Sequence, residues 1–315
     1  MTATPGPLRL LAGDRLPDVR LGLAGGDRVK LHVAFAGATL WLATPTSDES
    51  ARELPPPPDG VIALCVADAG GAPAPAGWRT VVPDPEWRAL FEPDVLWQAD
   101  ANLRLQWWRP LPLRAAPSAP AAAPPLSAAQ TALIAPVLQI PDVLEAELCS
   151  ALIRHLQHDC GGGEASAVRV LQHGQQQLQI DPSVKQRRES PPRDPALEAR
   201  LHERLVRRAL PEIARVFQFP VARRDPFKLL AYPADAGYFR AHRDNETRDV
   251  AYRRFALSVN LNAGGYDGGE FRFPEFGPHR FSPATGTALV FSCSLLHEVL
   301  PVQRGVRYAM TTFLA

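Results

Sequence analysis

The C-terminal stretch from residue 226 to 315 decides the fold. Apolar and polar residues alternate there with the period of two that is typical of β-strands, and clusters of Gly, Pro and Asp/Asn separate the segments. The segments are FKLLAY (227–232), YFRAHRD (238–244), RFALSVNLN (254–262), GEFRFPEF (269–276), TALVFS (287–292) and RYAMTTFL (307–314). So many short strands predict an antiparallel β-sandwich or barrel.

The residues before this stretch predict two amphipathic helices that can brace one face of the sheet. In the first helix, leucines recur every fourth position, and Asp142 with Glu145 forms a D-x-x-E capping signal at its start. The second helix is expected between the prolines at 191–192 and Pro220. The apolar stripes are Leu144, Leu148, Leu152 and Leu156 in the first helix, and Leu197, Leu201, Leu205, Leu210, Ile213 and Val216 in the second.

The N-terminal part has a different composition. All six tryptophans lie between Trp41 and Trp108, and all five tyrosines lie between Tyr232 and Tyr308. The Pro/Ala-rich segment RAAPSAPAAAPPLSAA (114–129) lies between these regions and is typical of an extended linker. We therefore expect two domains, residues 1–115 and 130–315, joined by a linker at 116–129. The core of the second domain is expected at 226–315.

The first domain reads as strands separated by Pro/Gly turns. A hairpin is expected between DVRLGL (18–23) and DRVKLHV (27–33), and two apolar runs, ATLWLA (38–43) and VIALCVA (61–67), fit buried central strands. A short helix is expected at 83–91 and a closing hairpin at 95–108. Together these elements predict a small α/β domain.

The composition excludes several classes of protein. A hydrophobic share of 46% is enough for a core, and a net charge of +1 gives no general attraction to nucleic acid or anionic membranes. No apolar run is long enough for a transmembrane helix, and the N-terminus lacks the pattern of a signal peptide. The cysteines form no CxxC pair, so neither a disulfide framework nor a thiolate zinc site is indicated. We therefore expect a cytoplasmic protein without nucleic-acid or membrane partners.

The strongest chemical signal is the His242-Arg243-Asp244 motif. Side chains at i and i+2 of a strand lie on one face, so the imidazole and the carboxylate can converge while Arg243 faces away. His297 follows a later strand that would cross the sheet opposite His242. Two imidazoles and one carboxylate form the facial triad of non-haem Fe(II) oxygenases, although zinc also accepts these ligands.

Arg307 is the fourth candidate residue. It lies in the last predicted strand, ten positions after His297. A guanidinium buried inside a barrel requires an anionic partner, because an unpaired buried charge is costly. Arg307 can hold a carboxylate through two parallel hydrogen bonds.

From residue 227 to 315 the chain resembles the 2-oxoglutarate/Fe(II)-dependent dioxygenases, in particular the prolyl-4-hydroxylase-like branch. The matching stretches are LLAYPADAGYFRAHRDN (229–245), RRFALSVNLN (253–262), GGEFRFPE (268–275) and FSCSLLHEVLPVQRGVRYAMTTF (291–313). The resemblance implies a double-stranded β-helix, or jelly roll, braced by helices. It also implies Fe(II) and 2-oxoglutarate as cofactor and co-substrate, O₂ as oxidant, succinate and CO₂ as products, and ascorbate as an accessory reductant.

The resemblance also implies roles for individual residues. His242, Asp244 and His297 would bind iron, and Arg307 would hold the far carboxylate of 2-oxoglutarate. Tyr232, Asn260 and Thr311 would line the same pocket, with Asn260 replacing a tyrosine found in some relatives. Halogenating relatives lack the carboxylate, so Asp244 favours hydroxylation. The substrate, peptidyl proline, another peptide side chain or a small molecule, stays open.

The first domain resembles peroxiredoxin/thioredoxin-like proteins. GDRLPDVRLGLAGGDRVKL (13–31) is similar to the first hairpin of that family, and ATLWLATPTSDE (38–49) falls where its active-site loop would be. The catalytic cysteine of the family is replaced by TPTS at 44–47, and Cys65 lies within a strand. We therefore expect a non-catalytic domain.

Other interpretations stay open at this stage. The chain could instead be a thiol peroxidase acting through the first domain, or a binding protein without catalysis. His155 and His158 lie three apart on one helix and could share a metal, but a structural role is the simpler interpretation. The arginines Arg243, Arg248, Arg253 and Arg254 and the basic run at 185–188 are either solvated or anchors for an acidic or peptide substrate. Cys293 is either a small buried residue or a site of oxidation.

Overall fold

The computed structural model describes residues 10–11, 14–23, 26–67, 74–84, 92–101, 103–111, 113, 134–172, 175–235 and 237–315. The chain divides into two compact units, Met1–Ile134 with Pro274–Pro278, and Ala135–Phe273 with His279–Ala315. The linker expected at 116–129 and most of the helix expected at 83–91 lie outside the described residues. No helix within the described ranges is long and apolar enough to cross a membrane.

The N-terminal unit is built on a seven-stranded mixed sheet with the order β2-β1-β5-β4-β3-β6-β7. Its central strands β3, β4 and β5 are parallel, and both apolar runs predicted to be buried form such strands. The elements are β1 (Arg20–Leu23), β2 (Arg28–Lys30), α1 (Leu31–Phe35), β3 (Thr39–Ala43), α2 (Asp48–Arg52), β4 (Val61–Val66), β5 (Trp78–Pro83), β6 (Val95–Ala99) and β7 (Leu105–Pro110). The expectation of a strand over 27–33 is wrong beyond Lys30, because helix α1 begins at Leu31 and the His32 backbone N–H is bound by Asp18 at 2.8 Å.

The C-terminal unit contains two principal sheets. An eight-stranded sheet has the order β8-β20-β16-β22-β14-β13-β9, with β17 paired to β22, and a five-stranded sheet has the order β12-β15-β21-β18-β19. Their strands are β8 (Leu138–Ile140), β9 (Glu164–Ala165), β12 (Lys185–Gln186), β13 (Arg188–Ser190), β14 (Lys228–Pro233), β15 (Tyr238–His242), β16 (Phe255–Asn260), β17 (Tyr266–Gly268), β18 (Phe271–Arg272), β19 (Arg280–Phe281), β20 (Ala288–Ser292), β21 (His297–Val299) and β22 (Val302–Leu314). This β-rich unit is consistent with a jelly-roll core.

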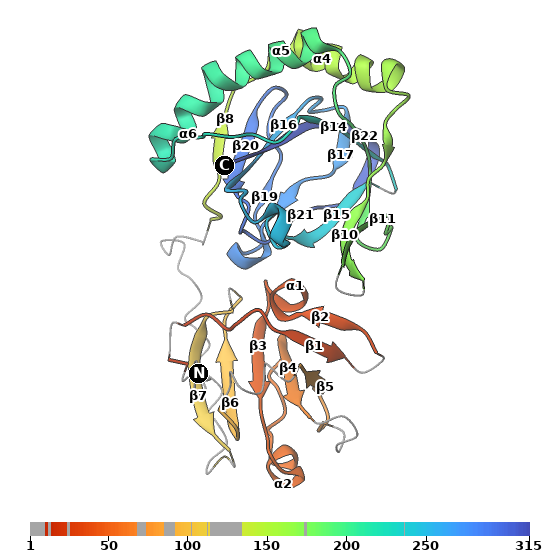
Figure 1. The fold of residues 1–315 in the computed structure, drawn as a ribbon. Helices are drawn as coiled ribbons and strands as arrows, with labels where there is room; N and C mark the ends of the chain where they lie inside the picture. The colour runs from red at the N-terminus through yellow and green to blue at the C-terminus, as the bar shows by residue number, and fades with distance from the viewer. Residues whose placement is uncertain are drawn as a thin grey trace. The chain divides into compact units, whose positions relative to one another are not determined.

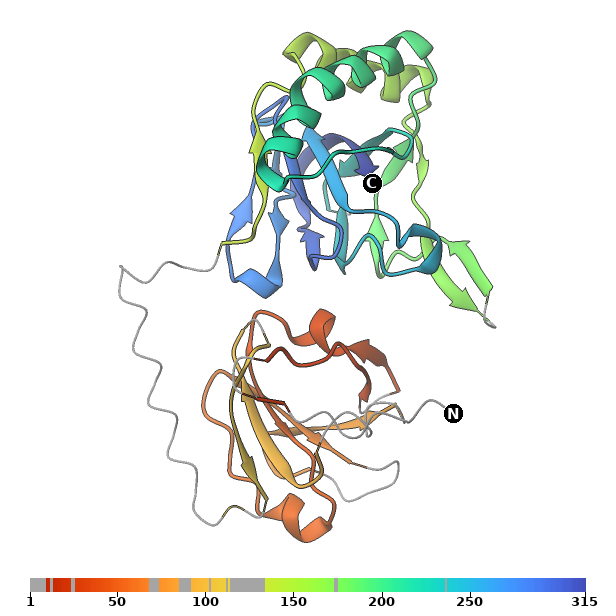
Figure 2. The same cartoon turned by 60° about the vertical axis from the view of Figure 1, so that its left-hand side comes forward.

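Helices cover one face of the larger sheet (Figure 1). They are α4 (Ala146–Arg154), η1 (His155–Asp159), α5 (Pro195–Arg204), η2 (Leu205–Ala209) and α6 (Leu210–Phe217), and short 3₁₀ turns occur at η3 (Arg248–Val250) and η4 (Pro274–Phe276). A separate hairpin, β10 (Val168–Gln172) with β11 (Gln175–Gln179), extends from the unit (Figure 2). The leucine stripe of the first helix is buried as predicted.

Two details of the helix predictions are wrong. Asp142 does not cap α4: it adopts a left-handed conformation with φ of 54°, and the N-cap position belongs to Glu145. Val216, assigned to the apolar stripe of the second helix, is 50% exposed. It lies in the last turn of α6, where the helix ends at Phe217 and extends past the sheet it covers.

The larger sheet packs one face on the helices and has several polar side chains on the other face. Leu229, Leu257 and Met310 belong to the core packed under the helices. Because side chains alternate along a strand, the residues between them face the other way. These are Lys228 and Tyr232 on β14, Ser258 and Asn260 on β16, and Arg307 and Thr311 on β22, which the strand register places side by side. Buried polar groups on an inner sheet face indicate a binding cavity.

Candidate metal centre and carboxylate pocket

His242 and His297 lie directly opposite each other on neighbouring strands. Their Cα atoms are partners in the β15–β21 ladder. The Nδ1 atom of His242 lies 2.7 Å from the Arg240 carbonyl oxygen, and the Nδ1 atom of His297 lies 3.0 Å from that of Leu295. A carbonyl oxygen only accepts, so each Nδ1 carries the proton and each Nε2 presents a lone pair. That is the tautomer a metal ligand needs.

Asp244 completes the group from outside the strand. The side chains of His242 and Asp244 converge as predicted. The expected reason, that both lie on one face of a strand, is wrong, because β15 ends at His242 and Asp244 lies in the following turn. Its backbone N–H donates to the Cys293 carbonyl at 3.0 Å, which holds the turn against the neighbouring segment. The Asp244 carboxylate oxygens lie 3.4 Å from Nε2 of His242 and 3.3 Å from Nε2 of His297. The three candidate ligand atoms lie within 4.8 Å of one another, so they could hold one metal ion.

The protonation states of the group also suit a metal. Burial opposes ionisation of Asp244, but the neighbouring His297, His242 and Arg253 lower its pKa to about 2. Burial, together with the neighbouring His242, lowers the pKa of His297 to about 4, although Asp244 opposes the shift. At neutral pH the site therefore contains an ionised carboxylate beside a neutral imidazole, which is the form that coordinates metal ions.

Aromatic rings fix the imidazoles from the sides. The Phe239 ring stacks on His242 with a centroid distance of 3.4 Å, and the Phe291 ring meets His297 edge-on at 4.6 Å. Phe271 lies 6.4 Å from the His297 ring and 5.1 Å from the guanidinium carbon of Arg307. Phe271 therefore lies between the histidine group and Arg307, which come from different sheets.

Arg307 is buried without a complete set of partners. Its relative exposure is 2%, and its Nη1 atom has no hydrogen-bond acceptor among the described residues. Its guanidinium carbon lies 5.2 Å from the Tyr232 ring, so part of the charge is stabilised by cation–π contact. No carboxylate of the described residues forms an ion pair with it, which leaves room for the carboxylate of a ligand.

The other three residues predicted for this pocket differ in what they can donate. Asn260 donates its Nδ2 to the Pro283 carbonyl at 2.7 Å, which leaves its Oδ1 as a buried acceptor without a partner among the described residues. Thr311 donates its hydroxyl to the Leu257 carbonyl at 2.9 Å. Thr311 therefore presents only an acceptor, whereas Asn260 keeps its second amide proton as well as the Oδ1 acceptor. The Tyr232 hydroxyl instead accepts a hydrogen bond from Arg187 at 2.6 Å.

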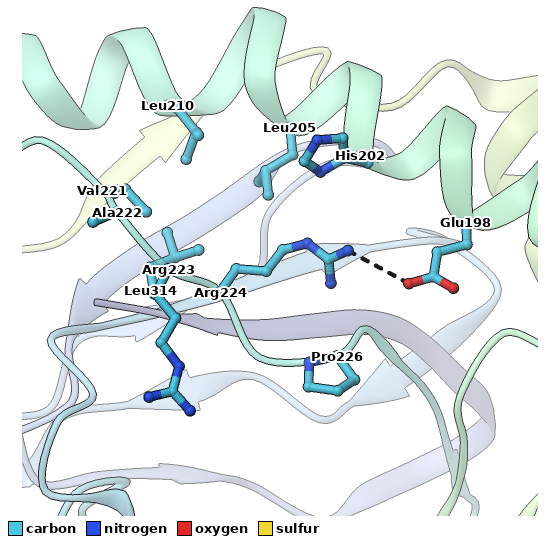
Figure 3. A pocket seen from close by; sticks show the side chains of 10 residues that line it. All are labelled: Glu198, His202, Leu205, Leu210, Val221, Ala222, Arg223, Arg224, Pro226 and Leu314. Atoms are coloured by element: carbon cyan, nitrogen blue, oxygen red, sulfur yellow. Dashed lines mark hydrogen bonds and ion pairs between the residues drawn. The ribbon is translucent and has the colours of Figure 1, made fainter.

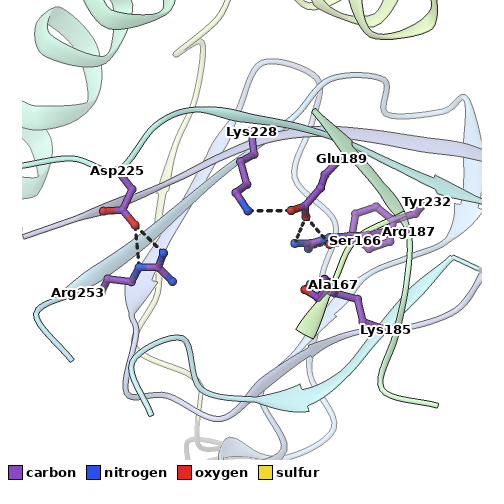
Figure 4. Close-up of polar contacts among 9 residues, drawn as sticks. All are labelled: Ser166, Ala167, Lys185, Arg187, Glu189, Asp225, Lys228, Tyr232 and Arg253. Carbon is purple, nitrogen blue, oxygen red and sulfur yellow. Dashed lines mark hydrogen bonds and ion pairs between the residues drawn. The ribbon is translucent and has the colours of Figure 1, made fainter. Parts of the chain in front are cut away.

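The remaining candidates have structural partners. His155 contacts Asp159 through Nδ1 at 2.8 Å and accepts the Arg193 backbone N–H through Nε2, so neither nitrogen is available to share a metal with His158. Arg253 donates two hydrogen bonds to Asp225, at 2.8 and 2.6 Å (Figure 4). The Cys293 thiol is fully buried, and burial raises its pKa far above the usual range.

A separate hollow lies between the helices and the edge of the larger sheet (Figure 3). Its volume is about 450 Å³, and apolar residues such as Leu205, Leu210 and Leu314 line it together with Arg223 and Arg224. Arg224 is paired with Glu198 at 3.4 Å. None of the triad residues lines this hollow, so it is distinct from the candidate metal centre.

Residues 227–315 match the family described as the 2OG-Fe(II) oxygenase superfamily. This segment is a 2OG-Fe(II) oxygenase domain. The protein is accordingly a 2-oxoglutarate-dependent dioxygenase. No curated protein matches the chain.

Several solved structures resemble part of the chain. A prolyl-4-hydroxylase of Pseudomonas putida is 23% identical over 56% of this chain and 91% of its own, with a TM-score of 0.43. The viral collagen prolyl hydroxylase of Paramecium Bursaria Chlorella virus-1 is 18% identical over 56% and 94%, with a TM-score of 0.40. A prolyl hydroxylase from Trichoplax adhaerens, solved with a hypoxia inducible factor peptide fragment, is 16% identical over 56% and 82%, with a TM-score of 0.41.

Two residues near the oxygenase pocket had no predicted role in it. Arg187 belongs to the basic run at 185–188, which had both a solvated and a substrate-anchor interpretation, and Glu189 directly follows that run. The structure places their side chains inside the unit, where Arg187 contacts Tyr232 and Glu189 accepts from Lys228 at 2.8 Å (Figure 4). Arg187 and Glu189 are two positions apart, a spacing that places both side chains on one face of an extended segment. A pattern of only two residues does not predict whether that face is buried or exposed.

Proposed function

We propose that the protein hydroxylates a peptidyl residue such as proline, or a small molecule, with conversion of 2-oxoglutarate and O₂ to succinate and CO₂. The observation that carries the proposal is the group of His242, Asp244 and His297 near a buried arginine with an unpaired nitrogen. The donor set fits Fe(II), and the orphaned Nη1 of Arg307 fits a carboxylate. Three protein ligands leave open positions for a chelating keto acid and O₂.

In this proposal the chain binds and orients the reactants. His242, Asp244 and His297 hold the metal, with Nε2 of both histidines facing it because their Nδ1 atoms are bound to backbone carbonyls. Arg307 binds the far carboxylate of 2-oxoglutarate, and Phe239, Phe271 and Phe291 exclude water around the site. Bound Fe(II) supplies the activation of O₂ that oxidises the substrate. Ascorbate would serve as an accessory reductant.

Turnover of the co-substrate tests this proposal. Full-length protein with Fe(II) and O₂ should convert 2-oxoglutarate to succinate, slowly without substrate and faster with one, as measured by mass spectrometry against peptide and metabolite pools. His242→Ala and Asp244→Ala should abolish the reaction and the binding of Fe(II), because each removes a ligand. His279→Ala is the matched control, since His279 is exposed and outside the group. Turnover retained in the two ligand variants would reject the assignment.

We further propose that the N-terminal unit is a non-catalytic, thioredoxin-like domain and that the protein is cytoplasmic. The segment where the active-site loop would lie carries TPTS at 44–47 and no cysteine, and Ser47 caps the short helix α2. Burial raises the pKa of Cys65 to about 11, so its thiol is protonated at neutral pH. Peroxide reduction that is lost on alkylation of Cys65 would instead support the thiol peroxidase alternative.

A further inference from the structure

Arg187 lies at the crossover between the two sheets of the oxygenase unit. It is the single residue between β12, in the five-stranded sheet, and β13, in the eight-stranded sheet. Its guanidinium donates through Nη1 to the Tyr232 hydroxyl at 2.6 Å, through Nη2 to Glu189 at 3.0 Å and through Nε to Ser166 at 3.4 Å (Figure 4). The side chain is 11% exposed and is therefore held by three partners in a largely dry environment.

Arg187 and Arg307 differ in whether a carboxylate of the chain neutralises their charge. The charge of Arg187 is neutralised by Glu189, whose other carboxylate oxygen accepts from Lys228 at 2.8 Å. Arg307 has no such carboxylate among the described residues. Arg187 is thus not the group that awaits an anionic ligand, and its contact with Tyr232 requires a different explanation.

The direction of the hydrogen bond determines what Tyr232 can do. A guanidinium has no acceptor, so it occupies a lone pair of the phenol oxygen and leaves the phenol proton to be donated elsewhere. Tyr232 is the cross-strand partner of Arg307, and the Tyr232 ring lies 5.2 Å from the Arg307 guanidinium carbon. The free phenol proton is therefore available beside Arg307.

A carboxylate needs donors, and the pocket offers few of them. Thr311 has committed its only side-chain proton to the Leu257 carbonyl, and Asn260 uses one of its two amide protons on the Pro283 carbonyl. The Tyr232 phenol therefore adds a donor beside Arg307, its cross-strand partner.

We propose that Arg187 is a positioning residue that turns the Tyr232 hydroxyl so that it donates to the far carboxylate of 2-oxoglutarate beside Arg307. This inference rests on the proposed function. Arg187 also lies against two rings, at 5.5 Å from Tyr232 and 5.1 Å from Phe239, which fixes the guanidinium between them. Arg187 acts through Tyr232 and does not touch the co-substrate itself.

A double-mutant cycle tests this role in the full-length protein. The dissociation constant of 2-oxoglutarate is measured by calorimetry, without O₂, for the Fe(II)-loaded wild type, Arg187→Met, Tyr232→Phe and the double variant. Each single variant should weaken binding about tenfold, because each removes one hydrogen bond to a charged group. The double variant should bind no more weakly than Tyr232→Phe, since Arg187 acts only through that hydroxyl.

Two further variants make the result specific. Arg188→Met is the matched control, because Arg188 is the exposed neighbour and bonds only the carbonyls of Gly162 and Gly163; it should bind like the wild type. Arg187→Lys keeps the charge beside Glu189 but lacks the planar fork, so it should reproduce the weakening even if Arg187→Met does not fold.

Three outcomes separate the possibilities. Unchanged affinity in both Arg187 variants overturns the inference, and so does a double variant about 100-fold weaker than the wild type, which would mean that the two residues act independently. A wild-type protein that does not bind 2-oxoglutarate would instead refute the proposed function itself.

Discussion

Arg307 buries a full positive charge whose Nη1 atom has no acceptor among the described residues. An unpaired charge of this kind destabilises the ligand-free fold, and the neighbouring rings of Tyr232 and Phe271 offset only part of that cost. We interpret this as a residue retained for ligand binding at the expense of stability.

Replacing Arg307 should separate these two effects. Arg307→Met keeps the apolar stem and removes the charge, so the melting temperature without 2-oxoglutarate should stay constant or rise. The affinity for 2-oxoglutarate should fall by about 100-fold or more, because a paired and buried charge is lost from the complex. Calorimetry and thermal denaturation with and without the co-substrate measure both. A large loss of stability in the ligand-free variant would contradict this account.

Glu189, which forms ion pairs with Arg187 and Lys228, makes the stability of the fold depend on pH. Burial opposes its ionisation, but Arg187 and Lys228 lower its pKa to about 2, below its usual value of 4.5. The ionised side chain therefore stabilises the fold above pH 4.5, and this contribution is lost as the pH falls from 4.5 towards 2.

The Glu189→Gln variant should show this dependence. Its free energy of unfolding should lie below that of the wild type by up to about 3 kcal/mol at neutral pH, and the gap should close in acid. Urea denaturation at several pH values between 3 and 7, on the order of one unit apart, gives both curves. A gap that is independent of pH would mean that Glu189 does not stabilise the fold through its charge.

At the scale of elements, the connection from β17 to β18 contributes to the carboxylate pocket. The glycines at 268–269 both adopt positive φ, 78° and 68°. A Cβ atom on Gly269 would also lie 2.9 Å from Cδ of Arg307 and 3.0 Å from Cγ2 of Val302. The turn therefore approaches the arginine so closely that a side chain would displace it.

Gly269→Ala should consequently lower both stability and co-substrate affinity. Strain at positive φ costs about 1–3 kcal/mol. The added methyl group would also displace the Arg307 side chain from its position in the carboxylate pocket. Gly264→Ala is the control, because Gly264 has a φ of 82° but open space around its Cβ position. This control should lose stability while binding 2-oxoglutarate like the wild type. Equal affinities in the two variants would show that the contact with Arg307 is unimportant.

At the scale of the whole molecule, each unit has its own apolar core. The oxygenase unit packs Leu148, Leu152 and Ile213 against Leu257 and its neighbours, and the N-terminal unit packs separate clusters around its own sheet. The candidate ligands and all four pocket residues come from the oxygenase unit.

Deletion of residues 1–115 should therefore leave a protein that folds and converts 2-oxoglutarate at a rate within about threefold of the full chain. Circular dichroism reports the folding, and succinate formation reports the chemistry. A fragment that folds but loses turnover would assign the N-terminal unit a part in the reaction.

The periodicity of the sequence was enough to predict most elements of the oxygenase unit. Leu148 and Leu152 are buried at helical spacing, and in the strands containing Leu229 and Leu257 alternate residues belong to the core under the helices. The boundaries were less well predicted. Asp142 takes a left-handed turn in place of the cap, and the Arg208 side chain binds its carbonyl at 3.1 Å. Asp244 lies beyond its strand, where its N–H donates to the Cys293 carbonyl. The sequence pattern reveals neither contact.

The sequence by itself determined which side chains can do the chemistry, namely two imidazoles, a carboxylate and an arginine in strands of alternating polarity. Which of their neighbours can still donate a proton depends on contacts made in the folded chain. Thr311 donates its only side-chain proton to a backbone carbonyl, Asn260 donates one of its two amide protons to another, and the Tyr232 phenol proton stays free because Arg187, 45 residues earlier, donates to the phenol oxygen. Periodicity is a local property of the chain, whereas hydrogen-bond partnership depends on where the chain crosses from one sheet to the other.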